Sequence, residues 1–159
     1  MSLPWPDHML TLEEWEGLPE HDELRLEVAE GILAMSITIP DAEVLVDRDP
    51  LTIRVPDVIV TGTTAYRRNP ARFHASEVLL AVEVLSDGTR RVDRVMKFSE
   101  YAEAGIPQYW IVDLDEPVTL TAYVLVDGDY ELSGELTGDP VLTVAGHPVR
   151  IDLAALTPR

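Results

Sequence analysis

The sequence predicts an α/β or α+β domain built on a mixed β-sheet. Apolar stretches with strand periodicity outnumber helical ones, and residues 78–112 follow a strand-helix-strand pattern. The chain has 159 residues, of which 46% are hydrophobic, which is enough for one domain with a sizeable core. We therefore expect a single domain over residues 1–159, with no repeat and no linker.

A short helix and a β-hairpin are predicted at the start of the chain. Residues 11–14 have capping-box spacing, so a helix is expected to begin there and to end before Pro19. In residues 24–28 apolar and charged side chains alternate with the period of a half-buried strand. Residues 30–31 then supply a turn into the apolar residues 32–35, which completes the hairpin.

Apolar residues 44–46 and 53–60 predict two further strands. Residues 49–50, Asp-Pro, are typical of a turn between them. Pro56 has no N–H to donate, so it marks a strand entrance or an edge within the second stretch. Residues 61–76 contain a glycine, a proline and three arginines, and are expected to form a surface loop.

The second half of the chain contains the strand-helix-strand unit. Residues 78–85 are apolar except for Glu83, which predicts a central strand covered on both faces. Thr89 is a suitable N-cap for a helix that runs through Ala104, and Gly105 ends it. Further strands are predicted at residues 109–112, 120–126 and 130–136, with an Asp-Gly turn at residues 127–128.

Composition and charge limit the functions that the chain can have. The absence of cysteine excludes disulfides, thiol catalysis and cysteine-ligated zinc. The formal charge of −17 repels nucleic acid globally, so any nucleic-acid activity must rest on local basic clusters or bound cations. The first residues lack the features of a secretory signal, and no window approaches the roughly 20 apolar residues of a membrane span. We expect a cytoplasmic protein without membrane contact.

Three acidic residues stand in or beside predicted strands, where carboxylates are costly to keep. Glu83 is flanked by valines in the most apolar run, so it needs a cation, a hydrogen-bonding network or a cleft. A strand-end glutamate paired with an arginine or solvent fits equally well. Taken alone, Asp57 is more typical of a strand-entrance cap, and Glu27 of the polar face of a hairpin. Together the three offer the oxygen ligands that a hard divalent ion prefers.

The chain has eleven arginines but a single lysine, Lys97, in the predicted helix. Helical periodicity places Lys97 and Tyr101 on the face opposite an apolar stripe that includes Val95 and Met96. An ammonium at Lys97 could orient water or offset charge on a phosphoryl oxygen. An ordinary i,i+4 pair with Asp93 on a solvated face explains it as well.

Seven of the basic residues fall into two clusters, the only places where phosphate binding is credible. One is in the predicted loop and the other is at the start of the helix, and internal salt bridges are an equally good explanation for both. The clusters are Arg67, Arg68 and Arg72, and Arg90, Arg91, Arg94 and Lys97.

Several stretches together resemble the Uma-two type of restriction endonucleases, within the PD-(D/E)XK nuclease superfamily. The most specific block is residues 80–86 (LAVEVLS), 89–93 (TRRVD), Lys97 and residues 101–113 (YAEAGIPQYWIVD). Residues 26–31 (LEVAEG) and 55–60 (VPDVIV) match upstream motifs in the same order.

The resemblance implies a restriction-endonuclease-like mixed β-sheet flanked by helices and hydrolysis of DNA phosphodiester bonds with Mg²⁺ or Mn²⁺. It makes Asp57 and Glu83 the metal carboxylates, Glu27 an additional acidic ligand or water-orienting group, and Lys97 the catalytic lysine. The backbone carbonyl of Val84 could complete the metal shell. The basic clusters would bind flanking phosphates.

The sequence departs from the family pattern in three respects: Asp87 and Gly88 follow Ser86 where a small residue and a proline are expected, and two further differences bear on activity. The usual acidic-x-lysine tripeptide would place lysine at residue 85, where Leu85 stands. The family also has a long helix between the first hairpin and the Pro-Asp strand, where this sequence has only residues 37–55. Either this protein has lost the helix or the sequence omits a segment.

The leading hypothesis is a metal-dependent DNA endonuclease, which is expected to form a homodimer through the strand-rich tail. The main alternative is an inactive member of the same fold that serves as a binding or assembly module, and the charge of −17 favours it. A third possibility is a small α+β protein whose acidic cluster merely binds a cation.

Overall fold

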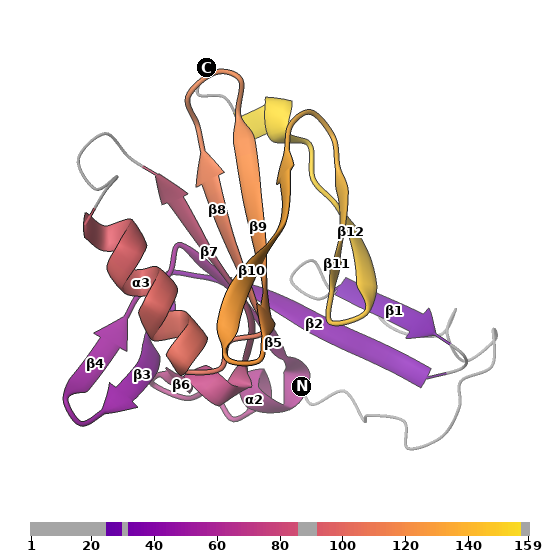
Figure 1. Ribbon diagram of the computed structural model, residues 1–159. Coiled ribbons are helices and arrows are strands. Elements are labelled where there is room, and N and C mark those ends of the chain that lie inside the picture. The colour runs from indigo at the N-terminus through magenta and orange to yellow at the C-terminus, as the bar shows by residue number, and fades with distance from the viewer. Residues whose placement is uncertain (1–24, 30–31, 86–91, 157–159) are drawn as a thin grey trace.

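A computed structural model describes residues 25–29, 32–85 and 92–156 of the chain. Its centre is a seven-stranded sheet in the order β1-β2-β5-β7-β8-β9-β10 (Figure 1). A three-stranded sheet, β4-β3-β6, and the hairpin β11-β12 complete the strands. The strand β7, which carries Glu83, is the fourth of the seven and therefore lies at the centre of the large sheet.

The described elements follow one another in this order along the chain. They are β1 (Arg25–Ala29), β2 (Ile32–Pro40), β3 (Val44–Arg48), β4 (Leu51–Arg54), β5 (Val58–Gly62), α2 (Thr63–Arg67), β6 (Phe73–His74), the 3₁₀ turn η1 (Ala75–Glu77), β7 (Val78–Leu85), α3 (Val92–Glu103), β8 (Gln108–Asp113), β9 (Thr119–Val126), β10 (Asp129–Leu136), β11 (Val141–Val144), β12 (His147–Arg150) and the 3₁₀ turn η2 (Leu153–Leu156).

The large sheet is mixed, as the sequence predicts. Strands β7 and β8 are parallel and are joined through α3, whereas the other neighbours in this sheet are antiparallel. A parallel pair needs a crossover connection, and the predicted strand-helix-strand unit supplies it. Gly105, with φ +81°, follows the helix in the left-handed conformation that glycine adopts at low cost. The α+β class is confirmed.

The predicted turns in the described chain are also found. Strands β1 and β2 form an antiparallel hairpin, and β3 and β4 are joined through residues 49–50. Pro56 separates β4 from β5, since a strand ladder needs the N–H that proline lacks. Asp127 and Gly128 both have positive φ, the conformation that a tight two-residue hairpin turn requires.

The prediction of a surface loop at residues 61–76 is wrong in part. Strand β5 continues to Gly62, and α2, β6 and the start of η1 follow within this stretch. Ala65, Phe73 and Ala75 are buried in the core, so the segment packs against the large sheet instead of lying free in solvent. The apolar residues that anchor it are too widely spaced to show a helical or strand period.

The two faces of the large sheet are covered by different structures, which lie on opposite sides of it in Figure 1. On one face, α3 and the small sheet bury side chains such as Ile59, Ala81 and Tyr109. On the other face, the hairpin β11-β12 and η2 cover Leu80, Trp110 and their neighbours. This hairpin is not among the strands that the sequence predicts. Covering both faces explains why β7 is apolar along almost its whole length.

Some sequence predictions lie outside the described residues. They are the helix expected at residues 11–18, the turn at residues 30–31 and the cap at Thr89. Within the described ranges, no helix combines the length and the apolar character that crossing a lipid bilayer takes.

Candidate functional site

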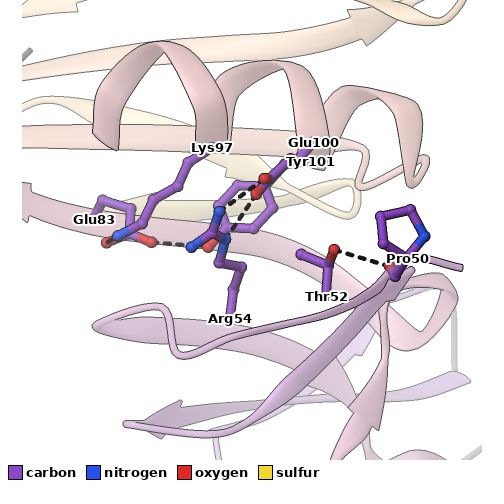
Figure 2. A network of polar contacts seen from close by, with 7 residues as sticks. All are labelled: Pro50, Thr52, Arg54, Glu83, Lys97, Glu100 and Tyr101. Carbon is purple, nitrogen blue, oxygen red and sulfur yellow. Dashed lines mark hydrogen bonds and ion pairs between the residues drawn. The ribbon is translucent and has the colours of Figure 1, made fainter. Parts of the chain in front are cut away.

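Glu83 is one of the few buried polar or charged residues of the described chain, with 7% of its surface exposed. It lies two residues after Ala81 on β7, so it points to the same face of the sheet, toward α3. Its two carboxylate oxygens have different partners. Lys97 Nζ lies 3.1 Å from Oε2, and the hydroxyl of Tyr101 donates a 2.9 Å hydrogen bond to Oε1 (Figure 2).

The prediction for the buried face of α3 is wrong. Val95 and Met96, expected to pack inward, are 69% and 51% exposed, whereas Tyr101 is fully buried. The side chain of Lys97 is only 17% exposed. The charged carboxylate of Glu83 beneath the helix explains why the face with Lys97 and Tyr101 packs inward. A buried charge that lacks one of its partners costs about 3 to 5 kcal/mol.

Asp57 reaches the same region from the neighbouring strand. It stands in the bend just before β5, two residues before the buried Ile59, whose side chain packs on the face covered by α3. Val58 pairs with Val82, which brings Asp57 beside Glu83. The backbone N–H of Val84 donates a 2.6 Å hydrogen bond to Oδ2 of Asp57.

The surroundings of Glu83 disfavour its ionised form. Burial raises its pKa above the ordinary value of 4.5, and the hydrogen bond from Tyr101 and the charge of Lys97 oppose that shift only in part. The negative charge of Asp57 raises the pKa of Glu83 further. Burial, and next the charge of Glu83, raise the pKa of Tyr101, so its phenol stays protonated and remains a donor.

These groups form a donor set that suits a hard divalent cation. Asp57 and Glu83 supply carboxylate oxygens, and the backbone carbonyl of Val84 is a third oxygen on the same strand as Glu83. The charge of Asp57 adds to the burial that raises the pKa of Glu83, and a cation between the two carboxylates would offset this repulsion. Among the described residues, no group of three or more acidic or histidine side chains is arranged to hold a metal ion.

Glu27 is not brought to this place by the strand register. It pairs with Ala34 of β2, whereas Pro40 of β2 pairs with Val58, next to Asp57. Six residues of extended strand separate Ala34 from Pro40, which is roughly 20 Å. The side chain of Glu27 lies outside the described residues, but its backbone position contradicts the expectation that it joins the other two carboxylates.

Two arginines of the first basic cluster make ion pairs with glutamates of the chain. Arg68 pairs with Glu77, and Arg72 pairs with Glu43 at 3.1 Å. Arg67 is exposed in the last turn of α2. For these two pairs the structure supports the alternative of internal salt bridges.

The second basic cluster lies largely outside the described residues. Arg90 and Arg91 are in the gap before α3, and of Arg94 only the helical backbone is described.

Sequence reasoning missed two contributors to the site. Helical spacing placed Tyr101 on the same face of α3 as Lys97, but its hydrogen bond to Glu83 was not predicted. Arg54, on β4, forms a two-pronged ion pair with Glu100, with both contacts at 2.7 Å. Its partner is 46 residues away, and no local pattern in the sequence indicates such a pair.

A solved structure has a similar fold. It is "a putative nuclease belonging to DUF820 from Anabaena variabilis ATCC 29413", with a TM-score of 0.57 and 16% sequence identity. The match covers 91% of this chain and 96% of the other one. At this identity the likeness shows a shared fold. Among curated proteins, none matches this sequence.

The family comparison reaches across most of the chain. The model of the Uma2 family, described as "Putative restriction endonuclease", matches residues 34–155. That range contains Asp57, just before β5, Glu83 on β7 and Lys97 on α3. Because the match spans well over half of the 159 residues, this chain belongs to the Uma2 family.

Proposed function

We propose that this protein is a divalent-metal-dependent endonuclease that hydrolyses DNA phosphodiester bonds. The descriptions "Putative restriction endonuclease" for the Uma2 family and "a putative nuclease" for the similar solved structure support the reaction class. The observation that carries the proposal is the convergence of Asp57 and Glu83 beneath Lys97, the only lysine of the chain. Paired carboxylates beside an ammonium are the groups that metal-assisted phosphodiester hydrolysis needs.

Asp57, Glu83 and the backbone carbonyl of Val84 are the proposed ligands for Mg²⁺ or Mn²⁺. When bound, the ion would supply Lewis acidity at a phosphoryl oxygen. Glu27 is not in this ligand set, since the register of β1 and β2 keeps it away.

The residues of the chain itself have separable roles in this proposal. Lys97 offsets the negative charge that develops on the phosphoryl oxygens, and its contact with Glu83 fixes where the ammonium stands. Tyr101 holds the Glu83 carboxylate by its hydroxyl. The N–H of Val84 holds Asp57. Both acidic groups are therefore oriented before a substrate arrives.

We further propose that the chain is one domain, acts in the cytoplasm and forms a homodimer. The alternative function is a non-cleaving binding or assembly module of the same fold. The charge of −17, together with the internal pairing of Arg68 and Arg72, favours that alternative, because both reduce attraction to a polyanion.

Plasmid nicking combined with metal titration tests the proposal. The wild type, Asp57→Asn, Glu83→Gln and Lys97→Met are compared at low salt with Mg²⁺ or Mn²⁺, and calorimetry measures Mn²⁺ binding to each. Asp139→Asn is a matched control, because it removes an exposed carboxylate that pairs with Arg150 on β12.

The expected result is nicking that requires the metal and falls at least 100-fold in the three site variants but not in the control. The two acidic variants should also lose Mn²⁺ binding. Nicking that survives all three substitutions rejects the site, and a wild type that binds Mn²⁺ without nicking supports the non-cleaving module.

A further inference from the structure

An ion pair that the proposed chemistry does not use connects the helix α3 to the small sheet. Nε and Nη2 of Arg54 each lie 2.7 Å from a carboxylate oxygen of Glu100. Both side chains are partly buried, with 27% and 24% of their surfaces exposed. Parallel contacts from a planar guanidinium to both oxygens of a carboxylate fix the orientation of the pair as well as its distance.

The positions of the paired residues connect this contact to the site. Glu100 lies three residues after Lys97 and directly before Tyr101 on α3, so all three lie on neighbouring parts of the helix surface. Figure 2 shows the side chain of Arg54 rising from β4 to meet Glu100 beside the group formed by Glu83, Lys97 and Tyr101. A rotation of α3 about its axis would move all of these contacts together.

Another part of α3 is held by aromatic packing. The ring of Phe98 makes edge contacts with Tyr123 and Tyr130, with centroid distances of 5.0 and 5.3 Å. These contacts fix the helix against β9 and β10, whereas Arg54 fixes it against β4. Val95 and Met96 are exposed and give the helix no comparable apolar anchor on their side.

We propose that Arg54 and Glu100 are positioning residues, whose ion pair sets the rotation of α3 and thereby keeps Lys97 and Tyr101 on the two oxygens of Glu83. The effect of the ion pair on the position of Lys97 does not depend on which reaction the protein catalyses. Its effect on turnover rests on the proposed function, because a displaced ammonium no longer meets the developing charge. A misplacement of about 1 Å can reduce turnover by roughly 100-fold.

The single lysine of the chain makes the geometric part directly measurable. Protein labelled with ¹³C- and ¹⁵N-lysine gives one lysine side-chain spin system by NMR, that of Lys97. Glu83→Gln supplies the reference signal for a lysine that has lost its carboxylate. The test variants are Glu100→Gln, which keeps the shape of the side chain, Arg54→Met, and the charge swap Arg54→Glu with Glu100→Arg.

Arg72→Met is the matched control, because Arg72 also pairs with a glutamate, Glu43, but at a site away from α3. We expect the Lys97 signal to move toward the Glu83→Gln reference in both single variants and to return in the charge swap. The control should leave it unchanged. In the nicking assay kcat should fall about 10-fold to 100-fold in the single variants, with KM changing much less.

The two ideas can fail separately. A Lys97 signal that stays at its wild-type position in folded Glu100→Gln and Arg54→Met protein overturns the positioning role, whatever happens to turnover. A signal that moves in a protein whose wild type shows no nicking supports the positioning role and rejects the nuclease function.

Discussion

The backbone N–H of Val84 donates a 2.6 Å hydrogen bond to Oδ2 of Asp57, at the place where Pro56 interrupts the neighbouring strand. The ladder between β5 and β7 begins with Val58 and Val82, so the carboxylate takes over as acceptor just beyond the last paired residues. One side chain therefore ends a sheet ladder and supplies a candidate metal ligand next to Glu83.

Replacement of Asp57 should separate these two roles. Asp57→Asn keeps an acceptor for the Val84 N–H and should change the free energy of unfolding little, whereas Asp57→Ala loses the hydrogen bond and should cost about 0.5–1.5 kcal/mol. Both variants should lose Mn²⁺ binding. Urea denaturation and calorimetry measure the two effects, and an Asn variant that binds Mn²⁺ like the wild type would contradict the assignment.

The pH dependence of stability should reveal Glu83. Its pKa in the folded protein is raised above 4.5, mainly by burial, so the folded state binds a proton more tightly than the unfolded state. The contribution of Glu83 to stability is therefore greatest below the unfolded pKa and is lost as pH rises through the folded pKa.

Glutamine at position 83 cannot titrate, so the Glu83→Gln variant should not lose this stability as pH rises. In metal-free buffer, the difference in unfolding free energy, variant minus wild type, should become more positive as pH rises from about 4.5 and then level off. Urea denaturation at a series of pH values measures it. A difference that is constant with pH would show that Glu83 is not perturbed.

Two buried tyrosines allow a matched comparison of hydrogen bonds. The hydroxyl of Tyr101 donates to the Glu83 carboxylate, and that of Tyr130 donates to the neutral carbonyl of Ile106 at 2.8 Å. Tyr101→Phe should cost about 1.5–3 kcal/mol once Glu83 is ionised and less at low pH, because a charged acceptor binds more strongly. Tyr130→Phe should cost about 0.5–1.5 kcal/mol at every pH. Equal pH dependence in the two variants would argue against an ionised Glu83.

The paired arginines should contribute little to DNA binding. Each phosphate contact adds roughly 0.9 to the slope of log affinity against log salt concentration. Arg68 and Arg72 already pair with Glu77 and Glu43. Alanine at either position should therefore change that slope by less than the roughly 0.9 expected for one phosphate contact. Fluorescence anisotropy with a labelled duplex over a salt series gives the slope. A fall of a full contact in either variant would restore that arginine to the phosphate-binding surface.

The sequence predicts elements well where periodicity and turn chemistry act locally. The strand around Glu83, the helix after it and the turn at residues 127–128 all show such signals, and the structure has them. The packing of residues 61–76 and the hairpin β11-β12 were not predicted. These segments are held by contacts with a sheet formed elsewhere in the chain, as the burial of Phe73 and Val144 shows.

The site was only partly accessible from the sequence for a related reason. Glu83 stood out because a charge within an apolar strand requires a partner, but the pattern did not name the partner. Simple amphipathicity then placed Lys97 on the solvent side of α3, since it counts a lysine as polar and ignores the carboxylate beneath. Arg54 and Glu100 meet only through the arrangement of three elements. Glu27 was grouped with the other acids because a linear sequence does not give strand register.

The pairing of Val58 with Val82 has a consequence for how the molecule can be assayed. If β5 paired with β7 one residue out of register, every side chain of β5 would change face. Asp57, just before β5, would then turn from the helix toward the hairpin side. Such a misfolded isomer would have the same mass and nearly the same strand content, yet it would contain no paired acids. The fraction of molecules that contain the acid pair therefore equals the fraction with the native register of β5 and β7. Spectra of secondary structure cannot distinguish the two registers.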